Sequence, residues 1–152
     1  MYINIKDQNI YYEETGSGLN LIFLHGWGNN LNSFIKQKEY FMNNYHLYMI
    51  DLPGFGLSKE PQECFTLDDY VNIVKEFINL KNIKEPVLIG HSFGGRIIIK
   101  LANLINLKAI ILISSAGIKN NKFKSASTGG EALCQCTKPS GVPRGPSHLQ
   151  FP

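Results

Sequence analysis

The residues best suited to chemistry lie in the segment Gly90–Gly95, which reads Gly-His-Ser-Phe-Gly-Gly. An apolar run at residues 86–89 precedes it, and a helix-like segment at 96–103 follows it. A strand, a Gly-x-Ser-x-Gly turn and a helix in this order are typical of a nucleophile elbow. In such a turn Ser92 projects its hydroxyl out of the sheet. The glycines two positions to either side leave room where side chains would collide with the neighbouring strand and helix.

A second glycine-containing loop supports this interpretation. His25–Gly28 reads His-Gly-Trp-Gly and follows an apolar run at residues 20–24. Glycines at a strand end let the backbone approach a ligand closely, and the helix after Ser92 directs its free N–H groups toward any oxyanion formed on an attacked carbonyl. A Gly-x-Ser-x-Gly string also arises by chance, and a glycine-rich turn can be a plain connection. The flanking elements and the second loop favour the elbow.

With a third segment, Asp51–Ser58 (Asp-Leu-Pro-Gly-Phe-Gly-Leu-Ser), these motifs resemble the α/β-hydrolase family in their order and approximate spacing. The resemblance covers residues 1 to about 120, the first half of such an enzyme, so the expected fold is a truncated α/β-hydrolase fold. It implies that Ser92 is the nucleophile. Relatives of the haloalkane dehalogenase type would carry aspartate at that position, so their chemistry is disfavoured.

The resemblance also implies the remaining site residues. The backbone N–H groups of Phe93 and Trp27 are expected to form the oxyanion hole. Substrate contacts are expected from His25, Gly26 and Trp27, where His25 shapes the loop through its backbone and Trp27 either lines a pocket or packs. His91, inside the turn, is expected to point away from the hydroxyl of Ser92 and to pack.

The elements that must position these groups follow from the hydrophobic pattern. After an antiparallel hairpin at residues 2–14, strands and helices alternate. The expected strands cover residues 20–24, 46–50, 86–89 and 107–113, and the expected helices cover 32–43, 67–80 and 96–103. Thr66 and Asp69 form a variant capping pair before the second helix. The alternation predicts an α/β fold with a mostly parallel sheet, whose carboxyl ends gather His25, Asp51 and Ser92.

Composition narrows the class of protein. The chain has 152 residues, 43% of them hydrophobic, and a net charge of +3 with scattered basic residues. This favours one packed domain and gives no case for nucleic acid binding. No basic leader precedes an apolar core, and no uncharged apolar run approaches about 18 residues, so we expect no signal peptide and no membrane span. Three cysteines argue against a disulfide framework, and a cytoplasmic location is expected.

The composition changes near residue 123. Four of the seven prolines lie in residues 124–152, and no period of a strand or helix is found there. We therefore expect a partial hydrolase core at 1–123 and a disordered tail at 124–152. The tail is interpreted as foreign to the domain, through a frameshift, a fusion or a misjoined reading frame. A native flexible tail is the alternative.

The tail also holds what would complete a catalytic triad. A serine nucleophile needs a base, and the base needs an orienting acid. After Ser92 the only acidic residue is Glu131 and the only histidine is His148. Nothing in the pattern fixes their positions, so they are rejected as triad members. Cys134 and Cys136 fall short of the four ligands of a structural zinc site, so no metal and no cofactor are expected.

The expected function is a serine hydrolase of carboxylic esters, thioesters or related acyl compounds, acting on a small molecule. Without a credible base and acid, this chain alone is expected to be inactive. Two alternatives stay open. A non-catalytic hydrolase-fold protein would bind a small molecule or partner, and an acyltransferase would use the same elbow with an alcohol or amine in place of water. Neither the substrate nor the oligomeric state follows from the sequence.

Overall fold

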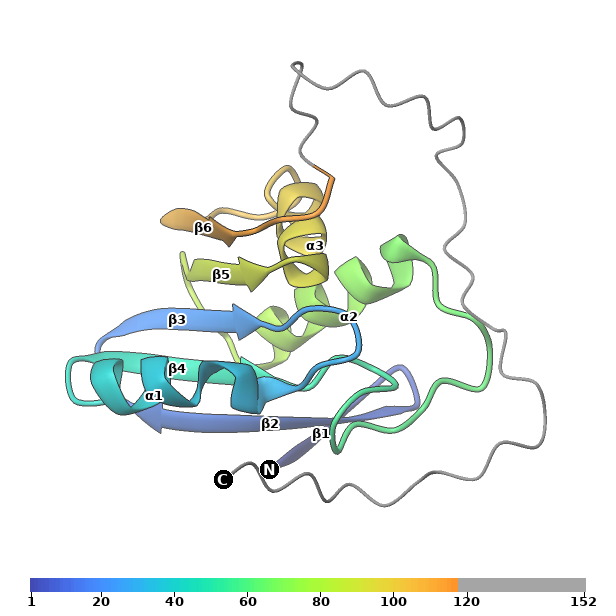
Figure 1. Ribbon diagram of the computed structural model, residues 1–152, viewed down its shortest axis with the longest axis horizontal. Coiled ribbons are helices and arrows are strands. Elements are labelled where there is room, and N and C mark those ends of the chain that lie inside the picture. The colour runs from blue at the N-terminus through green and yellow to red at the C-terminus, as the bar shows by residue number, and fades with distance from the viewer. Residues whose placement is uncertain (118–152) are drawn as a thin grey trace, which may run out of the picture.

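A computed structural model describes residues 1–117 of the chain, and six strands form its sheet (Figure 1). The strands are β1 (Tyr2–Ile5), β2 (Gln8–Gly16), β3 (Leu19–Leu24), β4 (Tyr45–Ile50), β5 (Val87–His91) and β6 (Ala109–Ile113). The helices are the 3₁₀ turn η1 (Leu31–Phe34), α1 (Ile35–Phe41), α2 (Leu67–Leu80) and α3 (Phe93–Leu101). The predicted tail at 124–152 lies outside the described residues.

The sheet is mixed and has the order β1-β2-β4-β3-β5-β6. β2 pairs antiparallel with β1 and with β4, whereas β4, β3, β5 and β6 run parallel to one another. The prediction of a mostly parallel sheet with an N-terminal antiparallel hairpin is therefore confirmed. The chain moves from β3 outward to β4 and then crosses to β5 on the other side. The loops after β3 and β5 consequently leave the sheet side by side at its carboxyl edge.

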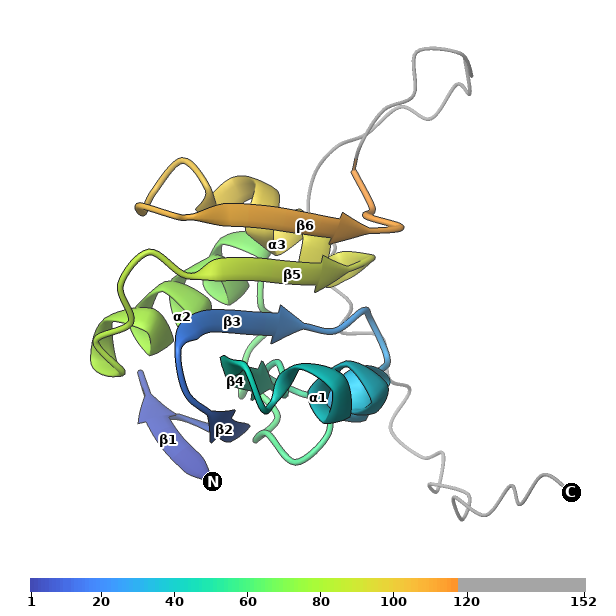
Figure 2. The same ribbon diagram turned by 90° about the vertical axis from the view of Figure 1, so that its left-hand side faces the viewer.

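Helices cover both faces of the sheet, with α2 and α3 on one side and α1 on the other (Figure 2). Ile22 and Leu24 of β3 belong to the core cluster under α2 and α3, whereas Leu21 and Phe23 belong to the cluster that includes Phe34 of η1. Because both faces of β3 are buried, its sequence is apolar without alternation. The same burial applies to most of β4 and β5, whereas β6 is an apolar run at the sheet edge whose residues are mostly exposed.

The helix boundaries show where local signals succeed and where they fail. The hydroxyl of Thr66 caps α2 by accepting the backbone N–H of Asp69. The carboxylate of Asp69 accepts the backbone N–H of Thr66 in return, which completes the predicted capping box. The single helix expected at 32–43 is instead η1 followed by α1. Asn30 caps η1 by accepting the backbone N–H of Asn32, which starts a tight 3₁₀ turn before the α-helix. α3 begins at Phe93 rather than at residue 96.

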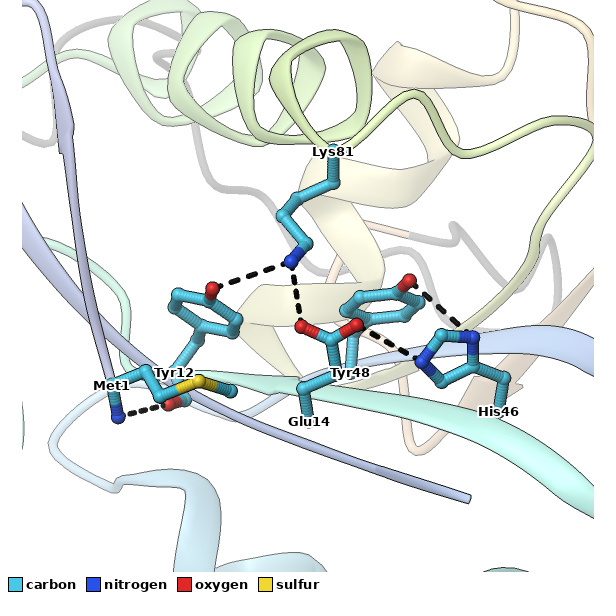
Figure 3. Close-up of polar contacts among 6 residues, drawn as sticks. All are labelled: Met1, Tyr12, Glu14, His46, Tyr48 and Lys81. Atoms are coloured by element: carbon cyan, nitrogen blue, oxygen red, sulfur yellow. Dashed lines mark hydrogen bonds and ion pairs between the residues drawn. The ribbon is translucent and has the colours of Figure 1, made fainter. Parts of the chain in front are cut away.

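A polar cluster fastens the C-terminal end of α2 to the sheet (Figure 3). The ammonium of Lys81, at the end of α2, lies 2.6 Å from Glu14 of β2, and the other oxygen of Glu14 lies 3.0 Å from His46 of β4. Lys81 also donates to the hydroxyl of Tyr12 at 3.4 Å and lies over the rings of Tyr12 and Tyr48. The cluster sits where the parallel strands begin, at the opposite end of the sheet from Ser92.

The cluster makes folding stability depend on pH. Burial would raise the pKa of Glu14, but the hydrogen bond and charge of Lys81, and then those of His46, outweigh burial and lower it below its ordinary value of 4.5. A carboxyl group with a lowered pKa stabilises the folded state above its unfolded pKa, and this contribution is lost as the pH falls through the folded value.

We therefore expect Glu14→Gln to lower the free energy of unfolding by about 1–3 kcal/mol at pH 7, because Lys81 loses its charged partner. The difference from the wild type should shrink below pH 4.5. Urea unfolding at pH 7 and pH 3 measures both quantities. The exposed Glu39 on α1 provides the matched control, and Glu39→Gln should change stability by less than about 0.5 kcal/mol. An equal loss at both pH values for Glu14→Gln would contradict this assignment.

Candidate active site

The loop after β3 is braced by the imidazole of His25, which is fully buried. The Nε2 atom accepts the backbone N–H of Leu52 at 3.0 Å, so the ring proton lies on Nδ1, which donates to the carbonyl of Gly26 at 2.8 Å. Burial lowers the pKa of His25, although the bond to Gly26 and the charge of Asp51 act in the opposite direction. The ring is therefore held neutral, and both of its nitrogens are occupied by structural hydrogen bonds.

The carboxylate of Asp51 performs a similar task after β4. Its two oxygens accept the backbone N–H groups of Leu31 at 2.7 Å and Leu57 at 2.8 Å. Gly56 has a φ of +55°, and a Cβ there would lie 2.0 Å from the carboxylate, so only glycine fits. Asp51 thus ties the start of η1 to the Pro-Gly-Phe-Gly turn. Its buried position and its two backbone partners give it a structural role.

Ser92 occupies the single residue between β5 and α3. Its φ of 49° and ψ of −106° are close to those of the first central residue of a type II′ turn, a position dominated by glycine. Its N–H donates to the carbonyl of Ile113 at 3.0 Å, and its carbonyl accepts the N–H of Ala116 at 3.1 Å. Its side chain is half-buried and makes no capping hydrogen bond to α3. The turn is therefore held by backbone bonds, and the hydroxyl is left out of them.

The glycines around Ser92 are required by close packing. A Cβ at Gly90 would lie 2.7 Å from the backbone of Gly94, and a Cβ at Gly94 would lie 2.1 Å from the carbonyl oxygen of Leu24. These are the collisions with the neighbouring helix and strand that the motif spacing predicts. At Gly26 a Cβ would lie 3.3 Å from the Cβ of Ser92 and 2.8 Å from the Nδ1 atom of His91. The loop after β3 therefore abuts the Ser92 turn.

Aromatic rings join the same segments. Trp27, which is 42% exposed, meets Phe55 and Phe93 edge-to-face at ring distances of 4.9 and 5.1 Å. Phe93 in turn meets Tyr70 of α2 at 5.1 Å. The backbone N–H groups of Trp27 and Phe93 donate to no other group within residues 1–117. The two residues predicted to bind an oxyanion are thus in direct contact through their side chains, while their amide hydrogens stay available.

Sequence reasoning missed part of this arrangement. Tyr70 fits the apolar stripe of a helix, and Phe55 lies inside a turn motif, so neither pattern singles it out as a neighbour of Trp27. Only the register of the strands brings the two loops and α2 together. Phe55 lies between two glycines, is partly buried and packs against the core cluster.

The described histidines do not pair with Ser92. Within residues 1–117, the hydroxyl of Ser92 forms no hydrogen bond with any side chain, and His46 binds Glu14 at the far end of the sheet. Glu131 and His148 lie outside the described residues. Across the part of the chain that the structure describes, no three metal-ligating side chains gather into a metal site, and no helix is long and apolar enough to cross a membrane.

Removing the carboxylate of Asp51 should destabilise the fold, because the buried backbone N–H of Leu31 and the partly buried N–H of Leu57 would lose their acceptor. We expect Asp51→Ala to lower the free energy of unfolding by about 2–4 kcal/mol, as measured by urea unfolding. Asp68→Ala, an exposed aspartate in the first turn of α2, is the matched control and should cost less than about 1 kcal/mol. Equal losses in the two variants would contradict the bracing role of Asp51.

The neutral state of His25 predicts acid sensitivity. A group with a lowered pKa stabilises the fold above its unfolded value of 6.5, and this contribution is lost as the pH falls through the folded pKa. The free energy of unfolding of the wild type should therefore fall between pH 6.5 and pH 5 more steeply than that of His25→Asn. Chemical denaturation across this pH range measures the two slopes. Parallel slopes would show that His25 protonates freely in the folded protein.

Comparisons with known proteins agree with this geometry. Residues 20–129 match the family model for the alpha/beta hydrolase fold. The chain is 29% identical over 130 residues to an (E)-2-((N-methylformamido)methylene)succinate hydrolase of Acinetobacter baylyi, covering 86% of this chain and 48% of that protein. It is 32% identical over 108 residues to a pimeloyl-[acyl-carrier protein] methyl ester esterase of Hamiltonella defensa, covering 70% and 40%.

A solved structure, the esterase EaEST from Exiguobacterium antarcticum, superimposes with a TM-score of 0.71 at 30% identity. That match covers 76% of this chain and 45% of the esterase. The chain therefore spans less than half the length of these relatives. The strand order, the serine turn after β5 and the match to the family model together place this chain in the α/β hydrolase family.

Proposed function

We propose that residues 90–95 form a nucleophile elbow and that Ser92 is the nucleophile of a serine hydrolase acting on carboxylic esters or related acyl compounds. The observation that carries the proposal is the backbone of Ser92, with φ 49° and ψ −106°. Holding a residue with a side chain in such a conformation costs on the order of 1–3 kcal/mol, and glycine would avoid that cost. A serine kept there, with a hydroxyl that the fold does not use, fits a chemical role.

The surroundings of Ser92 suit acyl transfer. The hydroxyl of Ser92 would attack the carbonyl carbon of the substrate, and the resulting oxyanion would accept hydrogen bonds from the N–H groups of Phe93 and Trp27. Support comes from the position of Phe93 in the first turn of α3, from the contact between Gly26 and Ser92, and from the lack of competing acceptors for both N–H groups within residues 1–117. One such donor contributes roughly 3–4 kcal/mol to the transition state.

The base and the acid of the mechanism are not found beside Ser92 among residues 1–117. A serine hydroxyl becomes nucleophilic when a base within hydrogen-bond reach accepts its proton. His25 cannot serve, because both of its nitrogens are bound to the backbone. We place the base and its orienting acid in the part of a complete hydrolase that corresponds to neither residues 1–117 nor the tail residues Glu131 and His148. The present chain alone is then inactive.

Two alternatives share the fold. An acyltransferase would use the same serine and oxyanion donors with a different acceptor. A non-catalytic binding protein draws support from the lack of a base bonded to Ser92 among the described residues. Such a binding protein would bind esters without turnover. The unfavourable backbone of Ser92 would then have no functional explanation.

Covalent labelling tests the proposal. In the complete hydrolase that contains this segment, a fluorophosphonate probe is expected to label Ser92, and Ser92→Ala should abolish labelling and lower kcat for a simple ester by at least about 10³-fold. Ser33→Ala, on the surface of η1, is the control and should leave both unchanged. Labelling that survives Ser92→Ala would overturn the assignment. Ester turnover by residues 1–152 alone, if it depends on Ser92, would show that the base lies within this chain.

A further inference from the structure

The imidazole of His91 lies directly against the loop that follows β3. A Cβ built on Gly26 would lie 2.8 Å from the Nδ1 atom of His91 and 3.4 Å from its Cε1 atom. Non-bonded heavy atoms pack at about 3.5–4.0 Å, so the shorter distance is an overlap. Gly26 is buried, and one edge of the imidazole therefore occupies the space that any side chain at position 26 would need.

His91 reaches this loop from the end of β5, the strand beside β3. Side chains alternate along β5, so that Leu88 belongs to the core cluster under α2 and α3, whereas Val87 and Ile89 belong to the cluster on the other face. His91 follows Ile89 by two residues, so its ring lies on the face opposite α3. Because β3 and β5 are parallel neighbours, the loop after β3 begins beside this ring.

The same loop carries the peptide group between Gly26 and Trp27, whose N–H is one of the two proposed oxyanion donors. The carbonyl oxygen of this peptide accepts the Nδ1–H of His25 at 2.8 Å and the backbone N–H of Asn29 at 3.2 Å. No peptide bond within residues 1–117 is cis, so the N–H of Trp27 points away from this carbonyl. Hydrogen bonds within the loop therefore set the direction of the N–H.

Hydrogen bonds within a loop do not set its distance from a neighbouring turn. His25 and Asn29 both belong to the loop. The atoms of the Ser92 turn nearest to a Cβ built on Gly26 are those of the His91 ring and the Cβ of Ser92, the latter at 3.3 Å. Within residues 1–117 no hydrogen bond or ion pair engages the imidazole of His91, so the ring acts there through its shape. A planar ring is a rigid spacer between the turn and the loop.

We propose that His91 is a positioning residue whose ring sets the distance between the Gly26–Trp27 peptide and the Ser92 turn, and so places the N–H of Trp27 where the oxyanion forms. This inference rests on the proposed function. His91 touches no reacting atom and acts through the backbone of Gly26. A displacement of about 1 Å in such a donor can lower a reaction rate about 100-fold, so a spacer of fixed size matters.

The contact itself is tested by urea unfolding of the whole 152-residue chain. In the wild-type background Gly26→Ala places a methyl group against the ring of His91 and should raise the equilibrium constant of unfolding at least about tenfold. In the His91→Ala background the same substitution should raise it less than about threefold. Equal factors in the two backgrounds would overturn the proposal. If His91→Ala does not fold, as judged by circular dichroism, His91→Val replaces it with the same expected factors.

The effect on the reaction is tested in the complete hydrolase that contains this segment. His91→Ala should lower kcat for a simple ester about 10- to 100-fold and change KM less than about twofold, because the oxyanion forms only in the transition state. His91→Phe keeps a planar ring and should retain kcat within about threefold. His46→Ala removes another half-buried imidazole, at the opposite end of the sheet, and should leave kcat unchanged.

Labelling and kinetics distinguish the two proposals. Fluorophosphonate labelling of Ser92 together with an unchanged kcat in His91→Ala would remove the role of His91 and leave the proposed function intact. An equal loss of kcat in His91→Ala and His91→Phe would also remove it, because the shape of the ring would then not be the cause. Absence of labelling in the wild type would instead remove the proposed function, and the role of His91 with it, whatever the unfolding experiment gives for the contact with Gly26.

Discussion

The unfavourable backbone of Ser92 is the constraint around which this half-domain is organised. A backbone conformation with φ 49° and ψ −106° is unfavourable for serine, so interactions with the surrounding chain must stabilise it. β6 and the residues after it do so with hydrogen bonds to both the N–H and the carbonyl of Ser92. Gly90 and Gly94 add to this because they let α3 pack directly on β5 and β3. Sheet, helix and turn therefore depend on one another.

The loops beside this turn are held by a different kind of interaction. Their backbone N–H groups are bound by two buried polar side chains, His25 and Asp51, in place of regular secondary structure. Each of these side chains reaches from the end of its own strand to another loop. As a result, hydrogen bonds to side-chain acceptors hold the loops at the carboxyl edge of the sheet together. His25 and Asp51 have a structural role here, although histidine and aspartate are residue types that often act in catalysis.

Much of the architecture could be read from the sequence because the signals were local. Strands buried on both faces appear as unbroken apolar runs. The Thr66–Asp69 pair predicts the start of α2, and the glycines at 90 and 94 predict the turn at Ser92. The start of α3 could not be read correctly, because Gly94 and Gly95 disfavour a helix by propensity, yet both are buried residues of α3 that lie close to Leu24 and Ser115. The tail beyond residue 117 lies outside the described residues.

Contacts between distant segments could not be predicted, because no local pattern in the sequence encodes them. The cluster of Lys81, Glu14 and His46 joins one helix end to two strands, and no periodicity links these positions. The ring contacts of Trp27 likewise depend on the crossover from β4 to β5, which places β5 beside β3 and so brings Phe93 to Trp27. The spacing of the glycines in the sequence identified Ser92, whereas its neighbours in space follow from the order of the strands in the sheet.

The bonds that Ser92 shares with Ile113 and Ala116 also have a consequence for folding during synthesis. The turn is translated more than twenty residues before the chain that locks its backbone. Before the ribosome has made that later part of the chain, these hydrogen bonds cannot form, and the backbone of Ser92 can adopt a more favourable conformation. The constrained backbone of Ser92 is thus fixed late, when β6 docks beside β5 and the residues after it bond to the turn.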